Sequence, residues 1–340
     1  MSFQSKSIWK NKILYIVAAV ALLVASVASF FVFSSDSPKP KPTSSSTTSS
    51  TTKPYIAPLT GLPDPTGESQ NRPALAVKIG NNPEARPQAG IAEADIMYEE
   101  IVEGGITRYM GVYHSTVPER VGPVRSVRGM DPNIALNWGG VFAYSGGSSA
   151  NESKIKNTRG IVALNETSAG SGMQRDRSRS APNNLYALPS VLFEKEASPK
   201  PPVAQFSFSN KVPSVTTTVS SFVVGFKSGF ACTWTYDAET GKFLRSYGTK
   251  PVVDQKGVQA AYENIIVQYI NYPSESEGIT TGSGRVQIFR DGKVVEGTWS
   301  RPSTSEPAEF TDADGNTILL KPGRTWVELV STSIAVTVTP

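Results

Sequence analysis

The sequence predicts an α+β protein with two consecutive domains, and three observations support this. Residues 55–202 alternate short strand-like runs with glycine-rich turns and helix starts, which predicts an α/β-like domain. Residues 203–340 carry alternating β-rich runs divided by turn signals, which predicts a mostly antiparallel β domain, a sandwich or open barrel. Hydrophobic residues make up 39% of the 340 residues, enough to bury a core in each domain.

An N-terminal transmembrane helix is predicted over residues 13–33, which contain no charged side chain. At about 1.5 Å per residue this segment is about 31 Å long and matches the apolar core of a bilayer. Lysines concentrate in residues 1–12, and a positive flank stays in the cytoplasm. We expect a single-pass anchor in the cell membrane with the rest of the chain outside the cytoplasm. Cleavage of the segment as a signal peptide, followed by secretion, is the alternative.

Residues 34–54 predict a disordered linker, because Thr43 to Thr52 are all serine or threonine and cannot build a core. The net charge of +4 arises from the lysines near the N-terminus. Residues 1–54 contain six lysines and one acid, which leaves 33 − 6 = 27 basic and 29 − 1 = 28 acidic residues in 55–340. Because the exported part is not basic, we expect no nucleic-acid partner.

The elements of the first domain follow from local patterns. "ALAVKIGN" at 74–81 predicts a strand that ends in a turn, and residues 94–115 predict a hairpin with Gly104-Gly105 at its tip. Residues 139–157 predict a strand, a glycine-rich loop and then a helix, and 188–197 predict a short helix.

In the second domain, the β-rich runs alternate around apolar positions that we expect to point inward. The sole cysteine, Cys232, lies in such a run, so we expect a buried, unreactive thiol and no internal disulfide. Trp234 belongs to the same alternation and is expected in the core. The other expected inward side chains are Phe243, Val286, Ile288, Trp299, Trp326 and Leu329.

Three glutamates in the hairpin are candidate catalytic residues. If Gly104-Gly105 is a two-residue turn, Ile101 pairs with Arg108, and Glu99 and Glu103 share a face with Arg108. Two interpretations stay open. The side chains form a structural Glu–Arg–Glu ladder, or Glu99, Glu100 and Glu103 supply a carboxylate pair for acid–base chemistry.

Arginine is strongly favoured over lysine between residues 72 and 179, which hold ten arginines and three lysines. A guanidinium group holds a carboxylate or a phosphate through two parallel hydrogen bonds. "VGPVRSVR" places Arg125 and Arg128 at a spacing that suits a helical first turn. "QRDRSRSAPNN" places Arg175, Arg177 and Arg179 on one face if the stretch is extended. Either these arginines converge on an anionic ligand, or they pair internally with the eleven acids of the same window.

The loop "YSGGSSANES" carries Ser148 between a strand and a helix, the layout of an anion-binding turn. The alternative is a helix N-cap whose glycines allow tight packing. A serine hydrolase would need His114, the single histidine, as its base. One histidine and one cysteine exclude the usual zinc ligand sets, and no nucleotide-phosphate fingerprint is present, so we expect neither a metal nor a cofactor.

Several motifs occur together in a fixed order: "NRPALAVKIGNNPEARPQAGIAEADIMYEEIVEGGITRYMGVY", "VGPVRSVR", "DRSRSAPNNLY", "NIIVQY", "GTWSR" and "LLKPGRTWVELV". In this order they resemble the YerB-like bacterial envelope lipoproteins, which carry N- and C-terminal domains of unknown function 3048. The resemblance spans residues 57–332. It implies a location outside the cytoplasm and two domains, and it implies no established chemistry. Members of that family are anchored through a lipid-modified cysteine, whereas this chain has the apolar segment described above.

These observations together predict a tethered envelope protein that binds an anionic cell-wall polymer or peptidoglycan component, and we expect binding rather than catalysis. A wall-glycan hydrolase or transferase that uses the hairpin glutamates is one alternative, and a protein-interaction scaffold is another. The expected ligand-binding residues are Arg108, Arg125, Arg128, Ser148, Arg175, Arg177, Arg179 and Asn184.

Overall fold

The computed structural model describes residues 54–213, 216–227 and 229–340. The predicted cytoplasmic tail, membrane segment and all but the last residue of the predicted linker lie outside these ranges. Within them, no helix is long and apolar enough to cross a membrane. The described residues form one compact unit.

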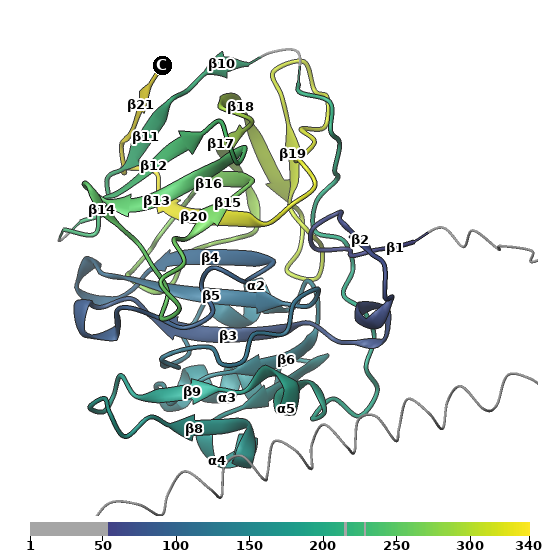
Figure 1. Ribbon diagram of the computed structural model, residues 1–340, viewed down its shortest axis with the longest axis vertical. Helices are drawn as coiled ribbons and strands as arrows, with labels where there is room; N and C mark the ends of the chain where they lie inside the picture. Colours follow the sequence, from purple (N-terminus) through teal and green to yellow (C-terminus); the bar gives the residue numbers. More distant parts are fainter. Residues whose placement is uncertain (1–53, 214–215, 228) are drawn as a thin grey trace, which may run out of the picture. The chain divides into compact units, whose positions relative to one another are not determined.

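A mixed sheet of 11 strands forms the centre of this unit (Figure 1). Its strands in spatial order are β10 (Thr217–Thr218), β18 (Lys293–Arg301), β17 (Gly282–Arg290), β16 (Asn264–Ile270), β20 (Thr325–Ser331), β4 (Ile96–Ile101), β5 (Thr107–Tyr113), β3 (Leu75–Gly80), β6 (Gly140–Ala143) and β7 (Ile161–Leu164), and β19 (Glu309–Thr311) pairs with β18. Strands from both sides of residue 202 therefore belong to one sheet, and β20 and β4 join the two parts in parallel.

Most strands of the central sheet run in the same direction. β16 is parallel to β20 and β20 to β4, while β3 is parallel to β6 and β6 to β7. β5 is antiparallel to both β4 and β3, so it joins these two groups in a common direction. β3, β4, β16 and β20 are buried along nearly their whole length, as is typical of interior strands covered on both faces. The edge at which these strands end is called the carboxyl edge below; the last residues there are Leu164, Ala143, Gly80, Ile101, Ser331 and Ile270.

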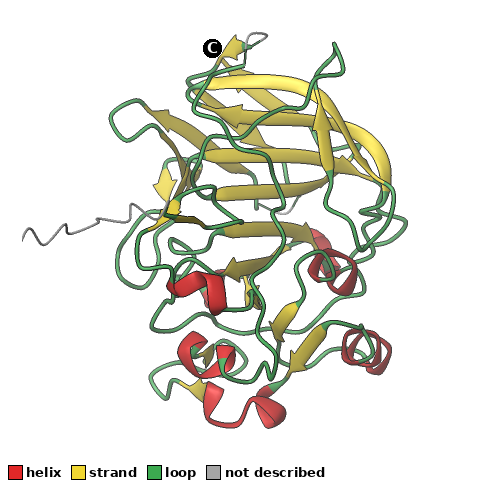
Figure 2. Ribbon diagram, turned by 90° about the vertical axis from the view of Figure 1, so that its right-hand side faces the viewer, coloured by secondary structure: helices red, strands yellow, loops and turns green. Residues whose placement is uncertain are grey.

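A second sheet of six strands packs on one face of the central sheet (Figure 2). It consists of β14 (Lys250–Pro251), β13 (Lys242–Tyr247), β12 (Cys232–Asp237), β11 (Ser221–Val224) and β21 (Val336–Thr339), with β15 (Ala261–Tyr262) beside β13, and all its pairs are antiparallel. The predicted mixed first part and antiparallel second part are thus both present. The second part is predicted to form a sandwich or open barrel by itself. The structure differs, because the six-stranded sheet packs against the mixed sheet, to which both parts contribute strands.

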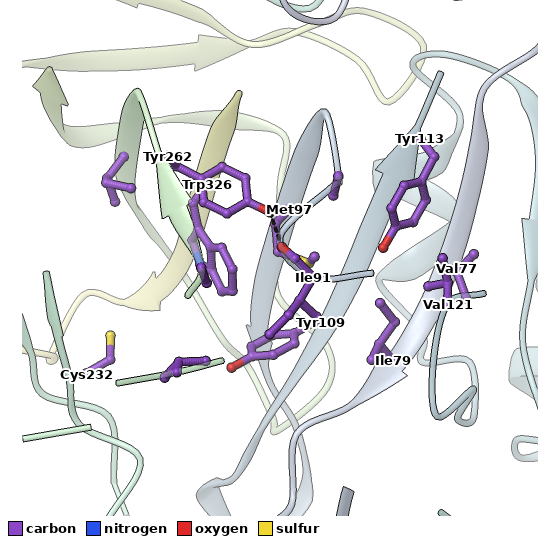
Figure 3. Packing of buried hydrophobic residues seen from close by; sticks show 14 of the residues in the cluster. Val77, Ile79, Ile91, Met97, Tyr109, Tyr113, Val121, Cys232, Tyr262 and Trp326 are labelled. Atoms are coloured by element: carbon purple, nitrogen blue, oxygen red, sulfur yellow. Dashed lines mark hydrogen bonds between the residues drawn. The ribbon is translucent and has the colours of Figure 1, made fainter. Parts of the chain in front are cut away.

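The core between the sheets is aromatic and tightly packed (Figure 3). The indole of Trp326 meets the rings of Trp234, Tyr262 and Tyr109 edge-on, with ring centroids 5.1–5.3 Å apart. This edge-to-face arrangement is favoured by the charge distribution of aromatic rings. Cys232 is fully buried in the same cluster, and burial raises the pKa of its thiol well above the usual range, as expected for an unreactive cysteine.

A second cluster of buried side chains covers the other face of the central sheet. Short helices and small strand pairs complete the unit. All the side chains that the sequence predicts to point inward are buried. The helices are α2 (Asp131–Ala135), α3 (Ser149–Lys156), α4 (Glu166–Ala169) and α5 (Pro189–Phe193), with 3₁₀ turns η1 (Glu68–Asn71), η2 (Pro83–Ala85), η3 (Glu103–Gly105) and η4 (Gly170–Gly172), and the small pairs are β1 (Tyr55–Ile56) with β2 (Pro63–Asp64) and β8 (Met173–Arg175) with β9 (Leu185–Ala187). The strand, loop and helix predicted over 139–157 are β6 and α3, and the helix predicted over 188–197 is α5.

The hairpin of β4 and β5 forms as predicted, but its observed register differs by one residue from the predicted register. Glu103, Gly104 and Gly105 form a 3₁₀ turn, with φ of 77° at Gly104 and 68° at Gly105, instead of a two-residue turn. Glu100, not Ile101, consequently pairs with Arg108. Because a one-residue slip exchanges the faces of a strand, Arg108 lies on the face of Glu100 and away from Glu99.

Candidate functional site

Three arginines gather at the carboxyl edge of the central sheet. Arg108 lies at the start of β5, directly opposite Gly80 at the end of β3. The backbone N–H of Arg125 donates to the carbonyl of Lys78 at 2.8 Å, which places the following segment beside the same strand end. Arg128 follows three residues later and converges on the same place, because Arg108 and Arg128 both donate to the carbonyl of Ser126.

Arg108 is buried, and its guanidinium forms no direct ion pair among the described residues. Arg108 is only 7% exposed, and its Nη1 donates a hydrogen bond to the carbonyl of Ser126 at 3.1 Å. It forms no ion pair with any carboxylate in the part of the chain that the structure describes. Burial and the neighbouring Arg128 and Arg125 lower the pKa of its guanidinium to about 10, against the opposing effect of the nearby Glu103 and Glu100 carboxylates. A buried charge without a partner is unfavourable, so this arrangement leaves a place for an anion.

The two neighbouring arginines are bound differently. Arg125 donates to Oδ1 of Asn183 at 2.7 Å, and burial together with Arg128 lowers the pKa of its guanidinium. Arg128 binds Glu103 through Nε at 3.0 Å and Nη2 at 2.6 Å, the two-pronged geometry of a strong pair. Of the three guanidinium groups, only that of Arg128 forms a direct ion pair with a carboxylate among the described residues.

The segment with Arg125 and Arg128 is extended and not the helical first turn that the sequence suggested. Two backbone hydrogen bonds to the Ser148 loop hold it in place: the N–H of Ser145 donates to the carbonyl of Arg125 at 2.9 Å, and that of Val127 donates to the carbonyl of Gly146 at 3.0 Å. The next helix begins only at Asp131. The backbone contacts across the sheet edge thus override the local spacing.

The Ser148 loop lies against the arginines and leads into α3. Gly147 is needed there, because a Cβ would come within 2.8 Å of the Val127 side chain. Ser148 is exposed, and its hydroxyl accepts from the N–H of Asn151 at 3.2 Å as the N-cap of α3. The expected N-cap is confirmed. It directs the first turn of α3, with its free N–H groups, toward the carboxyl edge.

The predicted face of Arg175, Arg177 and Arg179 does not exist. Only Arg175 belongs to a strand, because Asp176 closes a turn by accepting the N–H of Ser178 at 2.9 Å. The Arg179 side chain points back, and its Nη2 donates a hydrogen bond to the carbonyl of Glu84 at 2.8 Å. Arg177 is exposed, and its side chain forms no ion pair or hydrogen bond with the described residues.

Arg175 and Asn184 form a closed unit of their own. Arg175 binds both carboxylate oxygens of Glu166, at 2.8 and 2.5 Å, and donates to Oδ1 of Asn184 at 2.8 Å. Asn183, which the sequence analysis did not select, is the side chain that contacts Arg125. Both asparagines stand in the same Pro-Asn-Asn turn, so no local signal distinguishes them.

Glu99 is sealed inside the protein. It is fully buried, its Oε2 accepts from Arg245 at 2.5 Å, and its Oε1 accepts from Thr107 at 2.6 Å. Arg245 also binds Glu328 at 2.6 Å. The predicted ladder of Glu99, Arg108 and Glu103 is therefore wrong, because Glu99 shares Arg245 of the second sheet with Glu328. Burial raises the pKa of Glu99 well above its usual range.

Glu100 is equally inaccessible, because it is fully buried and paired with Lys78. Lys78 also binds Asp131, with Nζ 2.7 Å from Oδ1. Burial and the adjacent Asp131 raise the pKa of Glu100 to about 8, since one lysine cannot balance two carboxylates. Of the three hairpin glutamates only Glu103 is exposed, and it is held by Arg128.

Other catalytic arrangements lack the required geometry. His114 follows β5, whose last residue Tyr113 pairs with the first residue of β3, so the histidine lies at the edge opposite Ser148. It is fully buried, and its Nε2 is 2.8 Å from the carbonyl of Ser69. In the described ranges, no group of three histidine, cysteine or acidic side chains could hold a metal ion.

Fold and site together define a class of β-rich α+β proteins with a mixed sheet, a covering antiparallel sheet and an arginine cluster at the carboxyl edge. The chain belongs to the family described as "Protein of unknown function (DUF3048)": residues 59–200 match its N-terminal domain and residues 222–327 its C-terminal domain.

A relative and a crystal structure, both from Bacillus subtilis, support this assignment. The putative lipoprotein YerB of strain 168 is 28% identical over 306 residues, which cover 82% of this chain and 87% of the relative. The crystal structure of the YerB protein has the same fold, with a TM-score of 0.72, 24% sequence identity, and coverage of 83% of this chain and 99% of that chain.

Proposed function

We propose that this protein is tethered to the outer side of the cell membrane and binds an anionic cell-wall or envelope component. The apolar segment 13–33 and the name of the relative as a lipoprotein support a membrane-anchored location in the envelope. The proposed binding site consists of Arg108, Arg125 and Arg128 together with the Ser148 loop. The earlier candidates Arg175, Arg179 and Asn184 are left out, because their hydrogen bonds are directed elsewhere.

The buried, unpaired guanidinium of Arg108 carries this proposal. It is 7% exposed and lies beside two further arginines, and this raises the free energy of its charged state as long as no anion is bound. A bound phosphate or carboxylate would remove this penalty. Arg125 is half-buried and supplies a second donor at the surface, so the ligand can approach from solvent.

Binding without catalysis is favoured by the state of the hairpin glutamates. Glycoside hydrolysis needs two carboxylates about 5–10 Å apart on either side of an open cleft. Glu99 and Glu100 are 0% exposed and bound to Arg245 and Lys78, so neither reaches a substrate.

The test is a calorimetric titration of the full-length chain in detergent micelles with three probes: inorganic phosphate, teichoic acid and a muropeptide. Arg108→Gln is compared with Arg159→Gln, a matched change at an exposed arginine beyond α3. Each charged hydrogen bond contributes about 1.5–3 kcal/mol, so Arg108→Gln should weaken binding roughly 10- to 100-fold. Binding should also weaken as the salt concentration rises.

Arg159→Gln should bind like the native chain. Equal affinity of Arg108→Gln and the native protein would overturn the proposed site, and no binding of any of the three probes would overturn the proposed function.

A further inference from the structure

Two hollows extend the carboxyl edge away from the arginine cluster. The first, of about 150 Å³, is lined by Ile101 and Gly105, which flank the loop whose Glu103 binds Arg128. The second has a volume of about 290 Å³ and shares the lining residue Ile334 with the first. The first hollow therefore adjoins the loop that contacts the arginine cluster, and the second hollow adjoins the first.

The order of the strands explains this succession. The cluster lies beside the end of β3 and the start of β5. The first hollow is lined by residues at or just after the ends of β4, β16 and β20, and the second by residues near the ends of β16 and β20 and the start of β17. Neighbouring strands lie about 4.8 Å apart, so the five steps from β3 to β17 span about 24 Å. This length fits several units of a linear polymer and exceeds a single small ligand. We call the row of three sites the edge track.

The first hollow combines an apolar floor with charged groups at its rim. Phe226 and Tyr272 form part of the floor, and the exposed Lys227 offers a second cation beyond the arginine cluster. The rim also holds one acid, Glu275, whose carboxylate accepts the N–H of Gly104 at 2.8 Å. That contact ties the acid to the loop of Glu103.

The second hollow has the chemistry of a site for hydroxyl groups. Asn271, Ser283 and Thr332 are exposed there and offer an amide and two hydroxyls. Its one cation, Arg285, is 3.2 Å from the carboxylate of Glu296. Since that charge is balanced, the hollow suits an uncharged polyol or sugar unit rather than another anion.

From this succession of cationic and hydroxyl-binding positions we infer that the edge track binds a linear polymer of polyol phosphates. One phosphodiester would bind at Arg108, Arg125 and Arg128, and the chain would continue through the first hollow with its polyol units in the second. The inference rests on the proposed function, because it assigns an anion to the arginine cluster. It adds the class of polymer, its length and its path.

The test compares glycerol phosphate with poly(glycerol phosphate) as ligands of the full-length chain. The polymer should bind at least about tenfold tighter per repeat, because it also occupies the hollows. Thr332→Trp fills the second hollow and should reduce polymer affinity about tenfold, while the affinity for glycerol phosphate stays unchanged. Thr235→Trp, at an exposed position of β12, is the matched control and should change neither affinity.

A second pair of variants leaves the backbone and the packing in place. Lys227→Gln should weaken the polymer alone, whereas Lys250→Gln at an exposed position of β14 should have no effect. If Thr332→Trp and Lys227→Gln both bind the polymer like the native protein, the edge track is wrong, and the proposed function still stands provided glycerol phosphate binding depends on Arg108. If Arg108→Gln changes neither ligand, the proposed function fails as well.

Discussion

Replacing Arg108 by methionine should stabilise the protein, the opposite of what loss of a buried arginine usually does. Methionine keeps an unbranched side chain of similar length and removes the charge. Burial lowers the pKa of the guanidinium to about 10 in the folded chain. At about 1.4 kcal/mol per pKa unit, the charge costs the native state about 3 kcal/mol at neutral pH. The charged form is destabilised by folding, because the unfolded chain binds this proton more tightly than the folded chain does. Removing the charge should therefore stabilise the folded state.

Part of this gain is offset. The variant loses the hydrogen bond to the Ser126 carbonyl, and bonds from charged groups contribute about 1.5–3 kcal/mol. The free energy of unfolding should therefore rise by about 1 kcal/mol. Urea unfolding followed by tryptophan fluorescence measures it, in buffer without phosphate or other multivalent anions. Saturating phosphate should stabilise the native protein and leave Arg108→Met unchanged, because only the native site binds the anion.

The control is the same substitution at Arg245. This arginine is also fully buried, but it holds Glu99 and Glu328. Its loss leaves buried carboxylates without a partner and should cost about 3–5 kcal/mol. If Arg108→Met destabilises the protein as much as Arg245→Met does, Arg108 has its counter-ion within the protein and the reasoning for an anion-binding site is refuted.

Two further predictions concern pH and affinity. Burial lowers the pKa of His114 from 6.5 to about 4, so at pH 5 the unfolded imidazole is protonated and the folded one is not, which costs about 2 kcal/mol of stability relative to pH 7. His114→Gln should therefore lose about 2 kcal/mol less than the native protein between pH 7 and pH 5 in urea unfolding, and parallel pH profiles would contradict this. Glu103→Gln should strengthen phosphate binding about threefold in calorimetric titration, because it frees Arg128 from a half-exposed ion pair. Weaker binding by that variant would show that Glu103 positions Arg128 instead of competing with the ligand.

The positions of the elements follow from local sequence patterns. The helix after Ser148 and hairpins of the second part such as β12–β13 and β17–β18 depend on contacts between residues close in the chain. Hydrophobic alternation and turn residues fix such contacts without knowledge of the rest of the fold. The same holds for the N-cap at Ser148, whose partner is three residues away.

The register of the main hairpin was beyond local reasoning. Gly104-Gly105 fits a two-residue turn as well as the observed 3₁₀ turn, and the two differ by one residue in pairing. That single residue decides which glutamate lies beside Arg108. Arg245 illustrates the same limit, since it binds Glu99 from 146 residues further along the chain.

The sequence by itself determined the abundance of guanidinium groups, the lack of metal-ligand sets and the local order of strands and turns, because composition and short-range contacts are written in the chain directly. Only the tertiary structure decided which arginines find a carboxylate. Arg175 meets Glu166 nine residues away, while Arg108 lies at a strand end where the parallel sheet gathers three cations and one ion-paired acid. The physical reason is that charge pairing depends on distance in space, and the pairing of β20 with β4 brings residues hundreds of positions apart to one edge.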